Sequence, residues 1–214
     1  MMPTLPPNTL QIQDETLPTL LTQLRDRTLP PSTVRSLIRS LSTTITKNLP
    51  PLPETENAPE SDPETIAIIV VLRSGLAMFD GFIDTLSASL PTTTSTAIYH
   101  IGIFRDEASL DPVEYYNKLP RKPRCIRRAY VLDPLIATGG TAGAVVTILK
   151  EWGIDDVTFV SILASQEGLR RAAGVWPEGS RFVVAGIDPE VDGRGFIAPG
   201  VGDIGDRLFG TVFK

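Results

Sequence analysis

The sequence is poor in the residues that most often bind metals or form disulfides. Its 214 residues include one cysteine, Cys125, and one histidine, His100. A single cysteine excludes an intrachain disulfide and a thiolate metal cluster, which favours a reducing compartment. We expect Cys125 to be a spectator thiol, and His100 to pack or hydrogen-bond within a strand, because neither has a recognisable catalytic partner. Nucleophilic catalysis by cysteine is therefore disfavoured.

A long apolar run and a block of like charge are also missing. The longest clean apolar run, Ile66–Leu72, is far shorter than the roughly 20 residues that cross a bilayer. The first residues lack the basic and apolar regions of a secretion signal. Twenty basic and 25 acidic side chains give a net charge of −5, which does not favour nucleic-acid binding. We expect a soluble cytoplasmic protein, or a nuclear one, that binds neither membrane nor nucleic acid.

Proline marks off the first part of the chain. Residues 1–8 are proline-rich and are expected to be disordered, whereas Leu17–Arg27 and Ser32–Asn48 have the apolar spacing of helices. Ser32 is the expected N-cap of the second helix. Leu49–Glu64 contains five prolines among acidic and polar residues, which excludes a regular helix and predicts a mobile linker.

We therefore predict an N-terminal helical segment with a proline-rich linker over residues 1–64, and one α/β domain over residues 65–214. Within the domain, apolar segments alternate with helical ones, as in a mainly parallel sheet flanked by helices. The expected strands are Ile66–Leu72, Ser95–Phe104, Arg127–Leu132, Val157–Ala164 and Arg181–Ile187. The expected helices are Leu76–Leu90, Gly143–Trp152 and Glu167–Ala173.

A buried strand ending near Asp133 runs into a turn rich in glycine. Gly139 and Gly140 permit unusual backbone angles, so several N–H groups can converge on one anion beside the hydroxyls of Thr138 and Thr141. A helix starting near Thr141 would direct its free amides at the same point. Asp133 could accept hydrogen bonds from a sugar beside the phosphate. An ordinary strand-to-helix turn is the alternative, but the acid and the threonines favour a phosphate site.

Other polar segments follow strands of the expected sheet, where ligands of such sheets bind. Arg73-Ser74-Gly75 and Arg105-Asp106-Glu107 each bring an arginine, which favours an anion site. The stretch Arg105–Arg124 is expected to form a lid or arm, with a surface hairpin as the alternative. The glycine-rich stretch Gly193–Arg207 can bend closely around a small flat ligand, although such segments also form plain surface loops.

Six segments together resemble one known family, the uracil phosphoribosyltransferases. In the family's order they are Leu72–Leu76, His100–Glu107, Pro112–Pro120, Asp133–Thr141, Gly195–Asp203 and Gly205–Thr211. The resemblance runs from about Ile66 to the C-terminus, and the last two segments are typical of the uracil branch. It implies a type I phosphoribosyltransferase fold with a long lid or arm and a C-terminal hood. It also implies transfer of phosphoribose from 5-phosphoribosyl 1-diphosphate (PRPP) to N1 of uracil, giving UMP and diphosphate with Mg²⁺.

The resemblance also implies roles for individual residues. Those implied to bind PRPP are Arg73, Arg105, Asp133, Pro134, Leu135, Ile136, Ala137, Thr138, Gly139, Gly140, Thr141 and Asp203. Those implied to bind uracil are Ile197, Gly202, Asp203 and Ile204. Asp133, Arg105 and Asp203 would be catalytic, and Asp203 would also contact PRPP or its metal. Arginines and Mg²⁺ would stabilise the charge that develops on the leaving diphosphate.

Among the departures from the family pattern, the residue at position 204 leaves other functions open. Thr141 replaces the usual serine and keeps its hydroxyl, whereas Ile204 replaces the usual alanine and adds bulk beside the base. One alternative is a weak or inactive relative that binds PRPP as a regulatory module. Another is a phosphoribosyltransferase for a different base, which the Gly195–Asp203 segment disfavours. The resemblance further implies a homodimer or higher homo-oligomer, and possible control by GTP.

Overall fold

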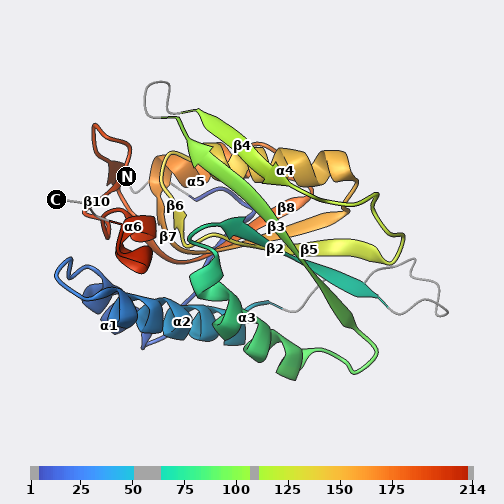
Figure 1. Ribbon diagram of the computed structural model, residues 1–214, viewed down its shortest axis with the longest axis horizontal. Coiled ribbons are helices and arrows are strands. Elements are labelled where there is room, and N and C mark those ends of the chain that lie inside the picture. Colours follow the sequence, from blue (N-terminus) through green and yellow to red (C-terminus); the bar gives the residue numbers. More distant parts are fainter. Residues whose placement is uncertain (1–4, 51–63, 107–110, 212–214) are drawn as a thin grey trace.

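The computed structural model describes residues 5–50, 64–106 and 111–211, and only the backbone of Arg105. Within these residues there are six helices and ten strands (Figure 1). The helices are α1 (Leu17–Leu24), α2 (Pro31–Lys47), α3 (Leu76–Ser89), α4 (Gly140–Trp152), α5 (Gln166–Ala173) and α6 (Ile204–Phe209). The strands are β1 (Thr9–Gln11), β2 (Thr65–Leu72), β3 (Ser95–Arg105), β4 (Pro112–Asn117), β5 (Ile126–Leu132), β6 (Leu135–Ile136), β7 (Asp156–Ser165), β8 (Ser180–Asp188), β9 (Glu190–Val191) and β10 (Ile197–Ala198).

One sheet organises the molecule. Its strand order is β1-β8-β7-β5-β2-β3-β4, and the short β6 also pairs with β7. These pairs are parallel except that β4 runs antiparallel to β3. Helices α1, α2 and α3 lie on one face of the sheet, and α4 and α5 lie on the other (Figure 1). The expected mainly parallel sheet flanked by helices is confirmed.

The continuous apolar run of β2 follows from this layering. Successive side chains of a strand point to opposite faces, so a strand covered on both faces needs apolar residues at every position. Ile68 packs in the core shared with α3, and Ile69 packs in the core shared with α4. The expected strands and helices of residues 65–214 are present with ends shifted by at most three residues, as are the two N-terminal helices.

Two expectations for the N-terminal part are wrong. Ser32 is not an N-cap: α2 begins at Pro31, and Pro30 occupies the cap position. Proline suits the first turn of a helix because its fixed backbone angle is helical and the first N–H groups have no partner there. The expected disorder does not extend to Asn8, whose side-chain amide donates to the carbonyl oxygens of Ala173 and Ser180 at 3.1 and 3.0 Å. The next residues form β1, a strand that the sequence did not predict.

The N-terminal helices contribute to the core of the sheet. Leu24 and Ile38 are fully buried in the same apolar cluster as Ile68. Residues 51–63, most of the expected linker, lie outside the described residues, and the division of the chain at residue 64 stays a prediction. Among the described residues, no helix combines the length and apolar character needed to cross a bilayer.

The expected lid or arm is described in part. β3 and β4 pair as a hairpin from Arg105 with Pro112 to Ile101 with Asn117, which matches the hairpin alternative for this stretch. Residues 107–110, which join β3 to β4 in the sequence, lie outside the described residues. Whether the hairpin acts as a lid stays a prediction.

Candidate active site

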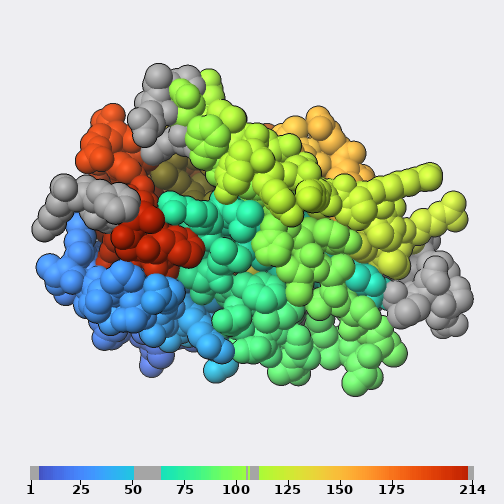
Figure 2. Space-filling model, in the orientation of Figure 1, coloured from blue at the N-terminus to red at the C-terminus, as the bar shows by residue number. Residues whose placement is uncertain are grey.

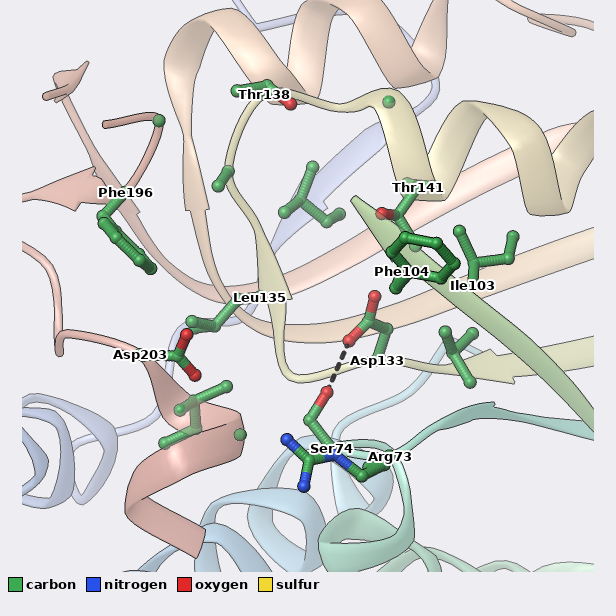
Figure 3. A pocket seen from close by; sticks show the side chains of 18 of the residues that line it. Arg73, Ser74, Ile103, Phe104, Asp133, Leu135, Thr138, Thr141, Phe196 and Asp203 are labelled. Carbon is green, nitrogen blue, oxygen red and sulfur yellow. Dashed lines mark hydrogen bonds between the residues drawn. The ribbon is translucent and has the colours of Figure 1, made fainter. Parts of the chain in front are cut away.

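Asp133 lies directly after β5, at the carboxyl end of the sheet. The hydroxyl of Ser74, from the turn after β2, donates to Asp133 Oδ1 at 3.2 Å (Figure 3). Burial raises the pKa of Asp133 to about 7, although hydrogen bonds from Ser74 and from the backbone of Leu135 act in the opposite direction. A ligand that brings hydroxyl donors or a cation to this carboxyl group would favour its ionised form.

The turn after β6 is held tightly against α5. Gly139 has a φ of 77°, and a Cβ atom there would lie 2.3 Å from the carbonyl oxygen of Gly168. A Cβ atom on Gly168 would in turn lie 2.0 Å from the carbonyl oxygen of Ala137. The hydroxyl of Ser165 donates to that same oxygen at 2.6 Å and accepts from the N–H of Gly168 at 2.9 Å. These contacts fix the path of the turn.

The two glycines of the turn have different reasons to be there. Gly139 needs its positive φ, which other residues rarely adopt, as the sequence predicts. Gly140 is the first residue of α4, its φ is not positive, and a Cβ atom there would meet nothing closer than 3.6 Å. Only one of the two glycines is therefore required by backbone conformation.

A pocket of about 310 Å³ lies against this turn. Its walls come from the end of β2, the hairpin, the turn after β6 and the segment before and within α6, and Figure 2 shows the hollow between the green hairpin and the red C-terminal segment. The predicted site residues that line it are Arg73, Asp133, Leu135, Ile136, Ala137, Thr138, Gly139, Gly140, Thr141, Gly202, Asp203 and Ile204. Most predicted PRPP and uracil residues therefore surround one cavity.

Of the predicted residues whose side chains the structure describes, two do not line this pocket. Ile197 is 4% exposed and packs in the core. The carbonyl group of Pro134 accepts hydrogen bonds from the backbone of β7. The side chain of Arg105 is not described, so its predicted role is open.

The pocket also contains residues that the predicted sets of site residues omit. Ser74 contacts Asp133, and its signals in the sequence are its place after a strand and within the resembling segment Leu72–Leu76. Phe104 and Tyr115 of the hairpin and Phe196 before β10 add aromatic rings to the lining. Figure 3 shows Phe196 and Phe104 on opposite sides of the cavity.

Arg73 lies at the edge of the pocket, next to Ser74. The peptide bond that precedes it is cis. Its guanidinium group lies 3.9 Å from the carboxylate of Asp206 and over the ring of Phe209. About half of the side chain, 53%, is exposed, so an anion can reach it.

Asp203 faces the pocket from the start of α6, across from Asp133 (Figure 3). Its carboxylate accepts from the N–H of Asp206 at 3.0 Å. Over the described part of the chain, no group of three or more histidine, cysteine or acidic side chains is placed to hold a metal ion. Two carboxylates around one pocket fit a hard cation such as Mg²⁺ only if a substrate supplies most of its oxygen ligands.

The strand order and the helices on both faces of the sheet identify the fold. Adenine phosphoribosyl transferase from Trypanosoma brucei, in complex with AMP, pyrophosphate and ribose-5-phosphate, has the same fold, with a TM-score of 0.51 and 14% identity over 85% of this chain and 84% of that one. The AQ2163 protein from Aquifex aeolicus superposes with a TM-score of 0.78 and 23% identity over 96% of this chain and 100% of that one. The fold is that of the type I phosphoribosyltransferases.

Sequence comparison gives the family. The family model described as uracil phosphoribosyltransferase matches residues 11–211. The urg2 protein of Schizosaccharomyces pombe is 44% identical over 182 residues, 85% of this chain and 80% of that one. The uracil phosphoribosyltransferase of Thermus thermophilus is 43% identical over 146 residues, 68% of this chain and 66% of that one. The chain belongs to the uracil phosphoribosyltransferase family.

Proposed function

We propose that the protein transfers the phosphoribosyl group of PRPP to N1 of uracil, giving UMP and diphosphate. The observation that carries the proposal is the meeting of buried Asp133, the turn after β6 and the Gly202–Gly205 segment around one cavity. The names of relatives such as the Thermus thermophilus enzyme support uracil as the base.

The turn and Asp133 account for PRPP binding in this proposal. Backbone N–H groups near Gly139 and the N-terminal end of α4 bind the 5′-phosphate, because both direct partial positive charge at an anion. The hydroxyls of Thr138 and Thr141 add donors. Asp133 accepts hydrogen bonds from the ribose hydroxyls, which compensate the carboxylate for its lost hydration.

The segment around α6 accounts for base binding. Backbone groups of Gly202 and Asp203 form hydrogen bonds to the edge of the base, and Phe196 packs against its face. Ile204 lines the pocket but is only 5% exposed, with most of its side chain packed in the core. The bulk that it presents to the base is therefore limited, which supports an active enzyme over a purely regulatory relative.

The reaction is a displacement at C1′ of the ribose. The bond from C1′ to the diphosphate oxygen breaks with its electron pair on the diphosphate, the bond to N1 of uracil forms, and the N1 proton is released to solvent. Arg73 and Arg105 stabilise the negative charge on the leaving group. Asp203 would hold Mg²⁺ mainly through PRPP, and the ion would neutralise further charge on the diphosphate. The β3–β4 hairpin would close over the site and exclude water.

Family resemblance alone supports three further parts of the proposal. They are assembly as a homodimer or higher homo-oligomer, GTP as an effector, and a cytoplasmic location.

The test is formation of UMP from PRPP, Mg²⁺ and radiolabelled uracil by the purified protein, with a control that lacks PRPP. Labelled UMP that depends on PRPP supports the proposal. Absence of UMP, with PRPP binding still measurable by calorimetry, would replace it with the regulatory-module alternative. Competition by unlabelled bases in the same assay tests whether uracil is the preferred acceptor.

A further inference from the structure

An arginine at the end of α1 binds the loop that precedes α6. The guanidinium group of Arg25 donates from Nη1 and Nη2 to the two carboxylate oxygens of Asp188, at 2.8 and 2.7 Å. Nη1 also donates to the carbonyl oxygen of Gly200 at 3.0 Å. Asp188 is the last residue of β8 and is only 6% exposed. Such two-pronged contacts fix both distance and orientation.

Asp188 also binds Gly200 directly. Its Oδ2 accepts from the N–H of Gly200 at 2.8 Å, so both peptide groups that flank this residue's Cα are bound. Burial alone would raise the pKa of Asp188, but the bonds from Arg25 and Gly200 hold it below its ordinary value. The contact is therefore a charged pair at neutral pH. Gly200 has a φ of 56°, and a Cβ atom there would lie 1.8 Å from the carbonyl oxygen of Ile197.

A second arginine, in α6, connects the loop before α6 to the end of α1. Arg207, in α6, donates from Nη1 to the carbonyl oxygens of Leu24 and Val201 at 2.7 and 2.6 Å, and from Nη2 to that of Asp26 at 2.6 Å. The last carbonyl groups of a helix have no partner within it, so the end of α1 offers acceptors. Figure 2 shows the red atoms of the C-terminal segment directly against the blue atoms of the N-terminal helices.

We propose that Arg25 and Asp188 are positioning residues for the nucleobase, which act by fixing the loop of residues 197–203. Neither side chain lines the pocket, whereas Gly202 and Asp203, two and three residues beyond Gly200, do. The inference deepens the proposed function and rests on it.

The anchors of the two substrate regions are separate. The turn after β6 is held by Ser165 and Gly168, whereas the loop before α6 is held by Arg25 and Asp188. Loss of the Arg25 contacts should therefore weaken binding of the base more than binding of PRPP, which shares only Asp203 with this loop. A general loss of stability would affect both substrates.

The test compares Arg25→Ala and Asp188→Asn with Arg39→Ala, which removes an exposed ion pair between α2 and Asp84. Each of the first two variants should raise KM for uracil about tenfold or more, because each removes hydrogen bonds to a charged group. KM for PRPP should rise several-fold less than KM for uracil, and the kinetics of Arg39→Ala should match those of the wild type. KM for uracil of Arg25→Lys should fall between the values of the wild type and Arg25→Ala. An ammonium group can pair with Asp188, but it lacks the planar two-pronged geometry of a guanidinium group.

Hydrogen exchange at the Gly200 amide, measured without substrate, reports the order of the loop directly. The inference predicts faster exchange in Arg25→Ala and in Asp188→Asn than in the wild type. Faster exchange with an unchanged KM for uracil, or equal rises in KM for uracil and PRPP, would overturn it while the proposed function stands. A wild-type protein that forms no UMP would overturn both.

Discussion

Asp133 is the residue on which the proposed chemistry most depends. It is buried, lies across the pocket from Asp203 and touches Ser74. We expect Asp133→Asn to lower the rate of UMP formation at least about 100-fold, because the amide keeps the shape but loses the charge that the ribose would meet. The fold should persist, as circular dichroism would show. Near-normal turnover by a folded variant would contradict the assignment.

The raised pKa of Asp133 also predicts how stability depends on pH. In the folded protein its carboxyl group keeps a proton up to a pH of about 7, whereas the unfolded chain loses it near 3.8. Between these values the folded state binds more protons, so the free energy of unfolding falls as pH rises, and this loss is complete above about 7. The total is at most on the order of 4 kcal/mol.

Asp133→Asn removes this dependence. Without substrate, its melting temperature should exceed that of the wild type by several degrees at pH 8, with the difference shrinking toward pH 4. Calorimetry at a series of pH values would measure it. Asp84→Asn changes a side chain that is 66% exposed and is the control. Its melting temperature should stay close to that of the wild type at every pH. A difference that stays constant with pH would refute the burial argument.

At the scale of the element, the turn after β6 and α5 form one unit. Gly139→Ala places a methyl group against the carbonyl oxygen of Gly168 and requires an unfavourable positive φ. We expect a rise in KM for PRPP of about tenfold or more and a loss of stability of about 1–3 kcal/mol, because the backbone must move where the phosphate would bind.

Gly193→Ala is the matched control for this prediction. A Cβ atom there would meet nothing within 4 Å, and the φ of Gly193 is not positive. Kinetics and thermal unfolding of this variant should resemble the wild type. If the two variants behaved alike, the close approach of the turn to α5 would not matter for binding.

At the scale of the whole molecule, the N-terminal helices complete one face of the sheet. Leu24, Ile38, Leu41 and Ile45 are fully buried there. Each such side chain contributes about 1.5–3 kcal/mol by burial, against a net stability of about 5–15 kcal/mol for a typical domain. Residues 64–214 expressed alone should therefore show no cooperative thermal transition by circular dichroism.

This prediction has a control in the full chain and one result that would contradict it. Ser36→Ala in the full chain, at an exposed position of α2, should leave the transition unchanged. Cooperative unfolding of residues 64–214, together with PRPP binding, would show that they form an independent domain after all.

Local patterns in the sequence were enough to predict most of the sheet and the turn. The apolar run of β2 and the Asp133–Thr141 segment each carry their signal within about ten residues. β1 lacks such a signal, because it is three residues long and depends on pairing with β8, about 170 residues away. The contact of Arg25 with Asp188, 163 residues apart, is unpredictable for the same reason. Periodicity reports burial and does not report which distant residues will meet.

The hydrogen bonds from Arg207 to the end of α1 can form only late in the synthesis of the chain. Arg207 leaves the ribosome 183 residues after Leu24, the residue whose carbonyl group it binds. The phosphate turn and its support on α5 are synthesised before that. A growing chain therefore contains the turn that would bind the 5′-phosphate before it contains the wall that would receive the acceptor base, and base recognition would be the last property that the protein acquires.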